Sequence, residues 1–95
     1  MNKTALTLAL CLAATHALAQ GRPQTTSMTC NAAKALVTAQ GAIVLGTGRD
    51  LFDRYVRSQN FCAGGQQTLT GFVPTSDNSQ CLIGYRCFDP PQETR

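Results

Sequence analysis

The chain has 95 residues, with eight basic and five acidic side chains and a formal net charge of +3. It is too short for two domains of ordinary size, so we expect a single small domain. A charge this mild lacks the concentrated basic surface of nucleic-acid-binding proteins, and we expect no nucleic-acid partner.

Residues 1–19 have the pattern of a secretory signal peptide. A positive charge at Lys3 is followed by an apolar run, and Ala17 and Ala19 are the small residues that signal peptidase requires before Gln20. The apolar run is shorter than the roughly 20 residues of a permanent membrane helix. The sequence therefore predicts an exported protein without a membrane span, periplasmic or secreted.

Four cysteines remain after the predicted cleavage, and they are Cys30, Cys62, Cys81 and Cys87. An even number in a small exported chain predicts two disulfides, and four cysteines allow three pairings that sequence cannot separate. We favour Cys30–Cys87 with Cys62–Cys81 over the sequential pairing, because a bridge across the whole folded segment closes the longest loop. A zinc site would need closely paired ligands, which this spacing does not provide.

One helix is predicted near the start of the mature chain. Residues 20–28 are polar and are expected to form a flexible arm. Residues 30–40 then carry apolar side chains at helical spacing, with Thr29 as a candidate N-cap and Gly41 as the stop signal.

The next two segments are expected to form strands. Residues 42–45 are a short apolar run bounded by glycines, which is typical of a central strand. Residues 51–57 fit either a helix or a strand, and we favour the strand because residues 46–50 have turn chemistry.

The second half of the chain is expected to supply two more strands. Residues 68–73 alternate loosely and end at Pro74, and residues 82–88 form a last strand that is broken or bulged at Gly84. A turn is expected at residues 75–79 between them.

The predicted fold class is α+β, with one N-terminal helix packed on a small three- or four-stranded antiparallel sheet and two disulfides. The expected domain covers residues 29–88, and residues 89–95 are expected to be a flexible tail.

Five short segments resemble a group of small exported proteins of alphaproteobacteria. They are residues 41–48, 52–56, 61–62, 73–75 and 81–87. The likeness extends over most of the mature chain, from Cys30 to Cys87. It implies export and the four-cysteine frame, and it brings no assigned activity and no functional residue with it.

The mature chain is poorly equipped for catalysis. The only histidine, His16, lies in the predicted signal peptide, so the usual general base at neutral pH is missing. Oxidised cysteines cannot act as thiolates. Asp50 and Asp53 are the nearest carboxylate pair, but both have arginine neighbours and are expected to form surface ion pairs. Asp77 could offer oxygens to calcium, although a turn role is the simpler reading. We expect no enzyme, no metal and no cofactor.

A group of arginines and aromatic residues is the candidate binding patch. Its members are Arg49, Phe52, Arg54, Tyr55, Arg57, Tyr85 and Arg86. Arginine and tyrosine are enriched in binding hot spots, and arginine also grips anionic groups. The alternative is that the aromatics fill the core while the arginines surround it.

The expected function is that of a small exported, non-catalytic binding or structural module of the bacterial cell envelope. Its partner would be an envelope protein or an anionic envelope component. The alternative is a secreted, host-facing effector or inhibitor.

Overall fold

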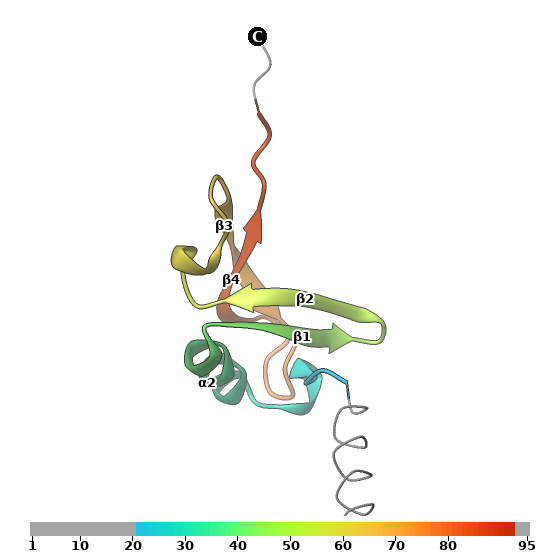
Figure 1. Ribbon diagram of the computed structural model, residues 1–95. Helices are drawn as coiled ribbons and strands as arrows, with labels where there is room; N and C mark the ends of the chain where they lie inside the picture. Colours follow the sequence, from blue (N-terminus) through green and yellow to red (C-terminus); the bar gives the residue numbers. More distant parts are fainter. Residues whose placement is uncertain (1–20, 93–95) are drawn as a thin grey trace, which may run out of the picture.

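The computed structural model describes residues 21–92 and shows an α+β fold, with one helix packed on a four-stranded antiparallel sheet (Figure 1). The elements in chain order are η1 (Thr25–Ser27), α2 (Cys30–Gln40), β1 (Ala42–Gly48), β2 (Leu51–Val56), η2 (Gln59–Phe61), β3 (Gln67–Val73) and β4 (Cys81–Phe88). The predicted fold class is confirmed. The predicted signal peptide lies outside the described residues.

Helix α2 begins and ends where the sequence predicts. The Thr29 hydroxyl accepts a hydrogen bond from the backbone N–H of Ala32 at 3.1 Å, which satisfies one of the free donors of the first turn. Gly41 ends the helix with a φ of 80°, a conformation that glycine adopts without steric cost. The buried face of α2 carries Ala33 and Val37, which pack on the sheet.

The sheet consists of two hairpins that meet along a short line. The strand order is β1-β2-β4-β3, and Val56 opposite Tyr85 is the only register pair between β2 and β4. Figure 1 shows the β1–β2 hairpin crossing the β3–β4 hairpin. The prediction that residues 42–45 form a central strand is wrong. β1 lies at the edge of the sheet, because β4 occupies the other side of β2.

The remaining strand predictions are confirmed. Residues 51–56 form strand β2 and not a helix, and the tight turn before it contains only Arg49 and Asp50. In the β3–β4 pair, Gly71 lies opposite Gly84 and Phe72 lies opposite Leu82. Ile83 is therefore the extra residue of a bulge beside Gly84, as the sequence predicts.

The segment before the helix, which was expected to be a flexible arm over residues 20–28, is packed onto the fold from Pro23 onward. Thr25 is fully buried, and its hydroxyl donates a hydrogen bond to the Pro74 carbonyl at 2.8 Å. The Pro23 carbonyl accepts a hydrogen bond from the backbone N–H of Gly46 at 2.8 Å. The first bond fastens the segment to the residue after β3, and the second places Pro23 at the outer edge of β1.

Two disulfides connect the elements, and their pairing differs from both pairings considered above. Cys30 is bonded to Cys81, and Cys62 is bonded to Cys87. The physical reason lies in β4, whose two cysteines stand at its opposite ends. The first turn of α2 lies beside the start of β4, and the loop after η2 lies beside its end.

The hydrophobic core is small, and its buried members are Ala33, Val37, Leu45, Tyr55, Val56, Val73, Cys81 and Ile83. Most of them are aliphatic side chains of modest size. Residues 89–92 follow β4 without regular secondary structure. Within residues 21–92, no helix has the length and hydropathy needed to cross a membrane.

Candidate functional site

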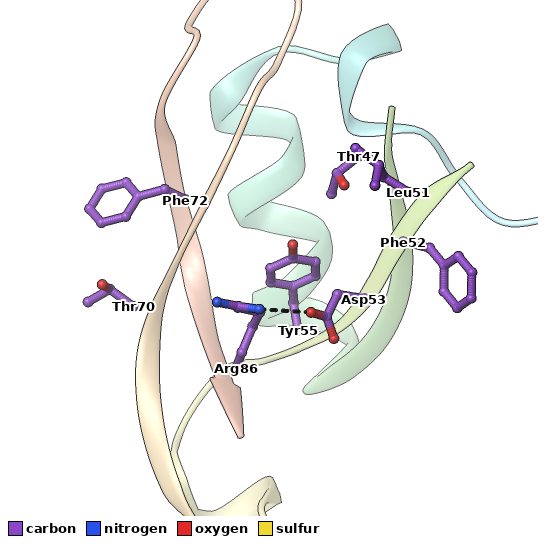
Figure 2. Close-up of a pocket in the computed structure, with 8 residues that line it drawn as sticks. All are labelled: Thr47, Leu51, Phe52, Asp53, Tyr55, Thr70, Phe72 and Arg86. Carbon is purple, nitrogen blue, oxygen red and sulfur yellow. Dashed lines mark hydrogen bonds and ion pairs between the residues drawn. The ribbon is translucent and has the colours of Figure 1, made fainter. Parts of the chain in front are cut away.

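An open concavity of about 430 Å³ lies between the two hairpins (Figure 2). Its lining residues are Thr47, Leu51, Phe52, Asp53, Tyr55, Thr70, Phe72 and Arg86. They come from all four strands of the sheet. The concavity exists because the hairpins diverge on either side of their single register pair.

An ion pair spans the concavity from one hairpin to the other. Arg86 Nη1 of β4 lies 2.9 Å from Asp53 Oδ2 of β2, and the two side chains are 42% and 45% exposed. The expectation of surface ion pairs is confirmed for Asp53, whereas Asp50 forms none within residues 21–92. An exposed pair of this kind contributes only about 0–1 kcal/mol to stability, so a partner could compete for either charge at small cost.

Tyr55 lies beside this ion pair and is almost completely buried. Its ring packs against Gly71, where a Cβ atom would come within 2.9 Å of the ring carbon Cδ1. Figure 2 shows its hydroxyl directed into the space between the hairpins. Burial raises the pKa of Tyr55 above 10.0, and the Asp53 carboxylate adds to this effect while Arg86 opposes it. The hydroxyl is therefore a neutral hydrogen-bond donor at physiological pH.

Exposed apolar side chains stand around the concavity. Leu51 is 62% exposed, Phe52 57% and Phe72 56%. In Figure 2 the Phe52 and Phe72 rings point away from each other, toward the outside of the two hairpins. The Arg22 guanidinium stacks over the Phe52 ring at 4.0 Å from its centroid. The interior is thus formed by Tyr55 and the ion pair, with Leu51 at the rim.

The structure divides the candidate binding patch predicted from the sequence. Tyr55 and Arg86 come together inside the concavity, whereas Phe52 borders it with its ring directed outward (Figure 2). Two of the arginines instead bond to backbone carbonyls elsewhere. Arg54 Nη2 donates to the Phe61 carbonyl at 3.2 Å. 

Arg57 has a second structural role of the same kind. Its Nη1 donates to the Thr38 carbonyl in the last turn of α2 at 2.7 Å, and its guanidinium lies 5.0 Å from the centroid of the Phe61 ring. Of the two remaining patch members, Arg49 lies in the β1–β2 turn, and Tyr85 lies on β4 opposite Thr70. The seven predicted residues therefore do not form one surface.

Several lining residues were not predicted. Leu51 borders the predicted patch in sequence, but Thr47, Thr70 and Phe72 carry no local signal that connects them with it. They reach the concavity only because one hairpin crosses the other. That crossing depends on the pairing of β2 with β4, which no periodicity in the sequence indicates.

Asp77, which was considered as an oxygen donor for calcium, has a structural role. Its Oδ1 accepts a hydrogen bond from the backbone N–H of Cys30 at 2.8 Å and another from the Thr75 hydroxyl at 3.0 Å. The bond from Cys30 is the main reason that the pKa of Asp77 lies below its usual 3.8, and the Thr75 bond adds to it. Asp77 therefore caps the N-terminus of α2 from a distant loop.

No protein-family model, no curated protein and no solved structure matches this chain. The geometry of the concavity is thus the basis on which a function can be proposed.

Proposed function

We propose that the protein is a small exported, non-catalytic binding module of the bacterial cell envelope, and that the concavity between its hairpins contacts an envelope protein. One observation carries the proposal. Leu51, the most exposed large apolar side chain, lies beside the half-exposed Asp53–Arg86 pair and the neutral Tyr55 hydroxyl. Apolar contact area with a few directed polar groups is the usual composition of a protein-binding site.

Export is supported by two features of the chain. Residues 1–19 have the composition of a signal peptide. The disulfides Cys30–Cys81 and Cys62–Cys87 fit an oxidising compartment, where such bonds form and persist.

The charges of the concavity favour a protein partner over an anionic polymer. Asp53 and Arg86 have opposite signs and already neutralise each other. Arg54 and Arg57 donate to backbone carbonyls at other places. An anionic polymer is gripped by several free cations on one face, whereas a protein loop offers an apolar side chain together with backbone donors and acceptors.

A binding role fits the chemistry of the lining side chains better than catalysis. The Tyr55 hydroxyl holds its proton at neutral pH, as a tyrosine ordinarily does, and burial raises its pKa further above 10.0. The Asp53 carboxylate is paired with Arg86. A protonated phenol and a carboxylate held by an arginine are groups that hydrogen-bond to a partner.

The test compares two exposed leucines, one inside and one outside the concavity. Leu51→Ala removes the apolar rim, whereas Leu82→Ala removes a leucine that is 42% exposed and does not line the concavity. Tagged wild-type and variant proteins are expressed in the native host, cross-linked in the intact envelope and purified with their partners. We expect one protein to be recovered with wild type and Leu82→Ala, and much less of it with Leu51→Ala.

Melting curves of both variants provide the control for folding. Since both leucines are exposed, we expect both variants to melt within a few degrees of the wild type. Equal recovery of the partner with the two variants would mean that the concavity is not the contact surface. Recovery of the protein from the medium alone would support the host-facing alternative over an envelope role.

A further inference from the structure

The two edge strands of the sheet, β1 and β3, differ in how much of their outer edge is covered by other parts of the chain. The outer edge of β1 is partly covered by the preceding segment, with a bridge between Gln24 and Gly46 and a hydrogen bond from the Gly46 N–H to the Pro23 carbonyl. The outer edge of β3 pairs with no strand or loop among residues 21–92. Within the described residues, the outer edge of β3 therefore has unpaired backbone donors and acceptors.

Strand β3 also lacks the features that keep an open edge from pairing. Natural edge strands are protected by charged side chains, by proline or by bulges within the strand. β3 is seven residues long, from Gln67 to Val73, and contains neither charge nor proline. The bulge of the β3–β4 pair lies on β4, at Ile83. The open edge is thus long, uncharged and regular.

The surface beside this edge is apolar. Phe72 and Leu82 are register partners on β3 and β4, and they are 56% and 42% exposed. Tyr85, opposite Thr70 on the neighbouring pair, is 39% exposed. An open edge next to three exposed large side chains is a surface suited to extension of the sheet by another strand.

We propose that the edge of β3 pairs with β3 of a second copy of this chain, antiparallel, around a two-fold axis at Thr70. The inference rests on the edge alone and not on the binding function proposed above. The resulting assembly is a dimer with one continuous eight-stranded sheet. Its interface is isologous, with the same strand contributed by each copy.

The sequence of β3 is complementary to itself in this register. Thr70 faces Thr70 of the second copy, and threonine pairs are favourable between antiparallel strands. Leu69 faces Gly71 of the second copy, and Phe72 faces Thr68 of the second copy. Leu69 and Phe72 thus each meet a smaller residue, Gln67 faces Val73, and no charged groups oppose each other. This fit favours a second copy over an unrelated strand.

The test changes Thr70, because in the proposed dimer this residue lies opposite Thr70 of the second copy. Thr70 is exposed, so lysine or aspartate fits there without burial of a charge. Sedimentation equilibrium of the exported, disulfide-bonded wild type is expected to give the mass of two chains at high concentration. Thr70→Lys and Thr70→Asp each place like charges opposite one another, and each is expected to raise the dimer dissociation constant by about two- to fivefold.

Mixing the two variants tests the register itself. Lysine in one copy then faces aspartate in the other, and the mixture is expected to form mixed dimers more tightly than either variant alone. Thr68→Lys is the matched control, because it adds the same charge to the same strand but faces Phe72 of the second copy. We expect it to dimerise more tightly than Thr70→Lys.

Two outcomes would overturn the proposal. One is a wild-type chain that stays monomeric at every concentration, including one that pairs its edge only with another protein. The other is a mixture of the Thr70→Lys and Thr70→Asp variants that associates no better than its components.

Discussion

Tyr55 is one of the residues through which the two hairpins contact each other closely. Its ring belongs to β2 but packs against Gly71 of β3, and its hydroxyl faces the concavity. A second close approach occurs at Gly84, where a Cβ atom would come within 2.6 Å of the Val56 carbonyl oxygen. Glycines at these facing positions of β3 and β4 let β2 cross over them. The shape of the candidate site thus depends on the absence of a Cβ atom at Gly71 and Gly84.

The contact between Gly71 and Tyr55 can be tested by the addition of one methyl group at Gly71. Gly71→Ala forces the buried Tyr55 ring to move, and overpacking of this kind costs about 1–3 kcal/mol. Gly64→Ala is the matched control, because a Cβ atom there has no neighbour within 4 Å. We expect urea unfolding to show a loss of stability for Gly71→Ala only. Equal stability of the two variants would show that Tyr55 is not held by this contact.

At the scale of elements, helix α2 depends on a group that lies far from it in the sequence. Thr29 caps the helix locally, but the Cys30 N–H donates to the carboxylate of Asp77, 47 residues away. A negative charge at a helix N-terminus is stabilising, because it interacts with the aligned peptide dipoles. The loop between β3 and β4 therefore fixes the start of α2 as well as connecting two strands.

This cap predicts a dependence of stability on pH. The pKa of Asp77 is lower in the folded protein than its ordinary 3.8, so the carboxylate stabilises the fold above that pH. The contribution is lost as the pH falls through the folded pKa. Asp77→Asn removes the charge, so we expect its deficit relative to wild type to be largest at neutral pH and to shrink in acid.

Urea unfolding at neutral and acidic pH measures this difference. Asp89→Asn is the control, since within the described residues Asp89 forms no side-chain hydrogen bond or ion pair, and its unfolding curves are expected to follow those of wild type. A deficit for Asp77→Asn that is the same at both pH values would contradict an electrostatic cap.

The elements also show which parts of the fold could be predicted from the sequence. Helix α2 and the bulge beside Gly84 are specified by neighbouring residues, and both were predicted. The edge position of β1 and the packing of Thr25 depend on contacts between distant segments. Local sequence patterns do not encode such contacts. The predictions of a central strand at residues 42–45 and of a flexible arm at residues 20–28 therefore failed.

The candidate site was likewise predicted only in part from the sequence. Phe52, Tyr55 and Arg86 were singled out by residue type, and they line the concavity. Arg54 and Arg57 have the same residue type but bond to backbone carbonyls, Arg54 to Phe61 at the end of η2 and Arg57 to Thr38 in α2. Residue type alone could not separate these two groups of arginines.

For the whole molecule, the disulfides compensate for a core that consists mostly of small side chains. Cys30–Cys81 fastens α2 to the start of β4, and Cys62–Cys87 fastens the loop after η2 to its end. The sequence separations are 51 and 25 residues, which correspond to about 4 and about 3.5 kcal/mol in the chain-entropy model. Such contributions are comparable to the whole stability of a small domain, which is about 5–15 kcal/mol.

The pairing of the cysteines is therefore the property on which this account most depends. Trypsin alone cannot resolve it, because residues 58–86 contain both Cys62 and Cys81 without an internal lysine or arginine. Cleavage before aspartate by a second protease separates them at Asp77 and also releases Cys87 with Phe88. Each cysteine then lies in its own peptide.

The decisive measurement is mass spectrometry of this double digest, without reduction, on protein recovered from its native host. We predict that the peptide with Cys30 is joined to residues 77–86, and that residues 58–76 are joined to the peptide with Cys87. Free thiols at these positions, or either of the other two pairings, would contradict the fold described here.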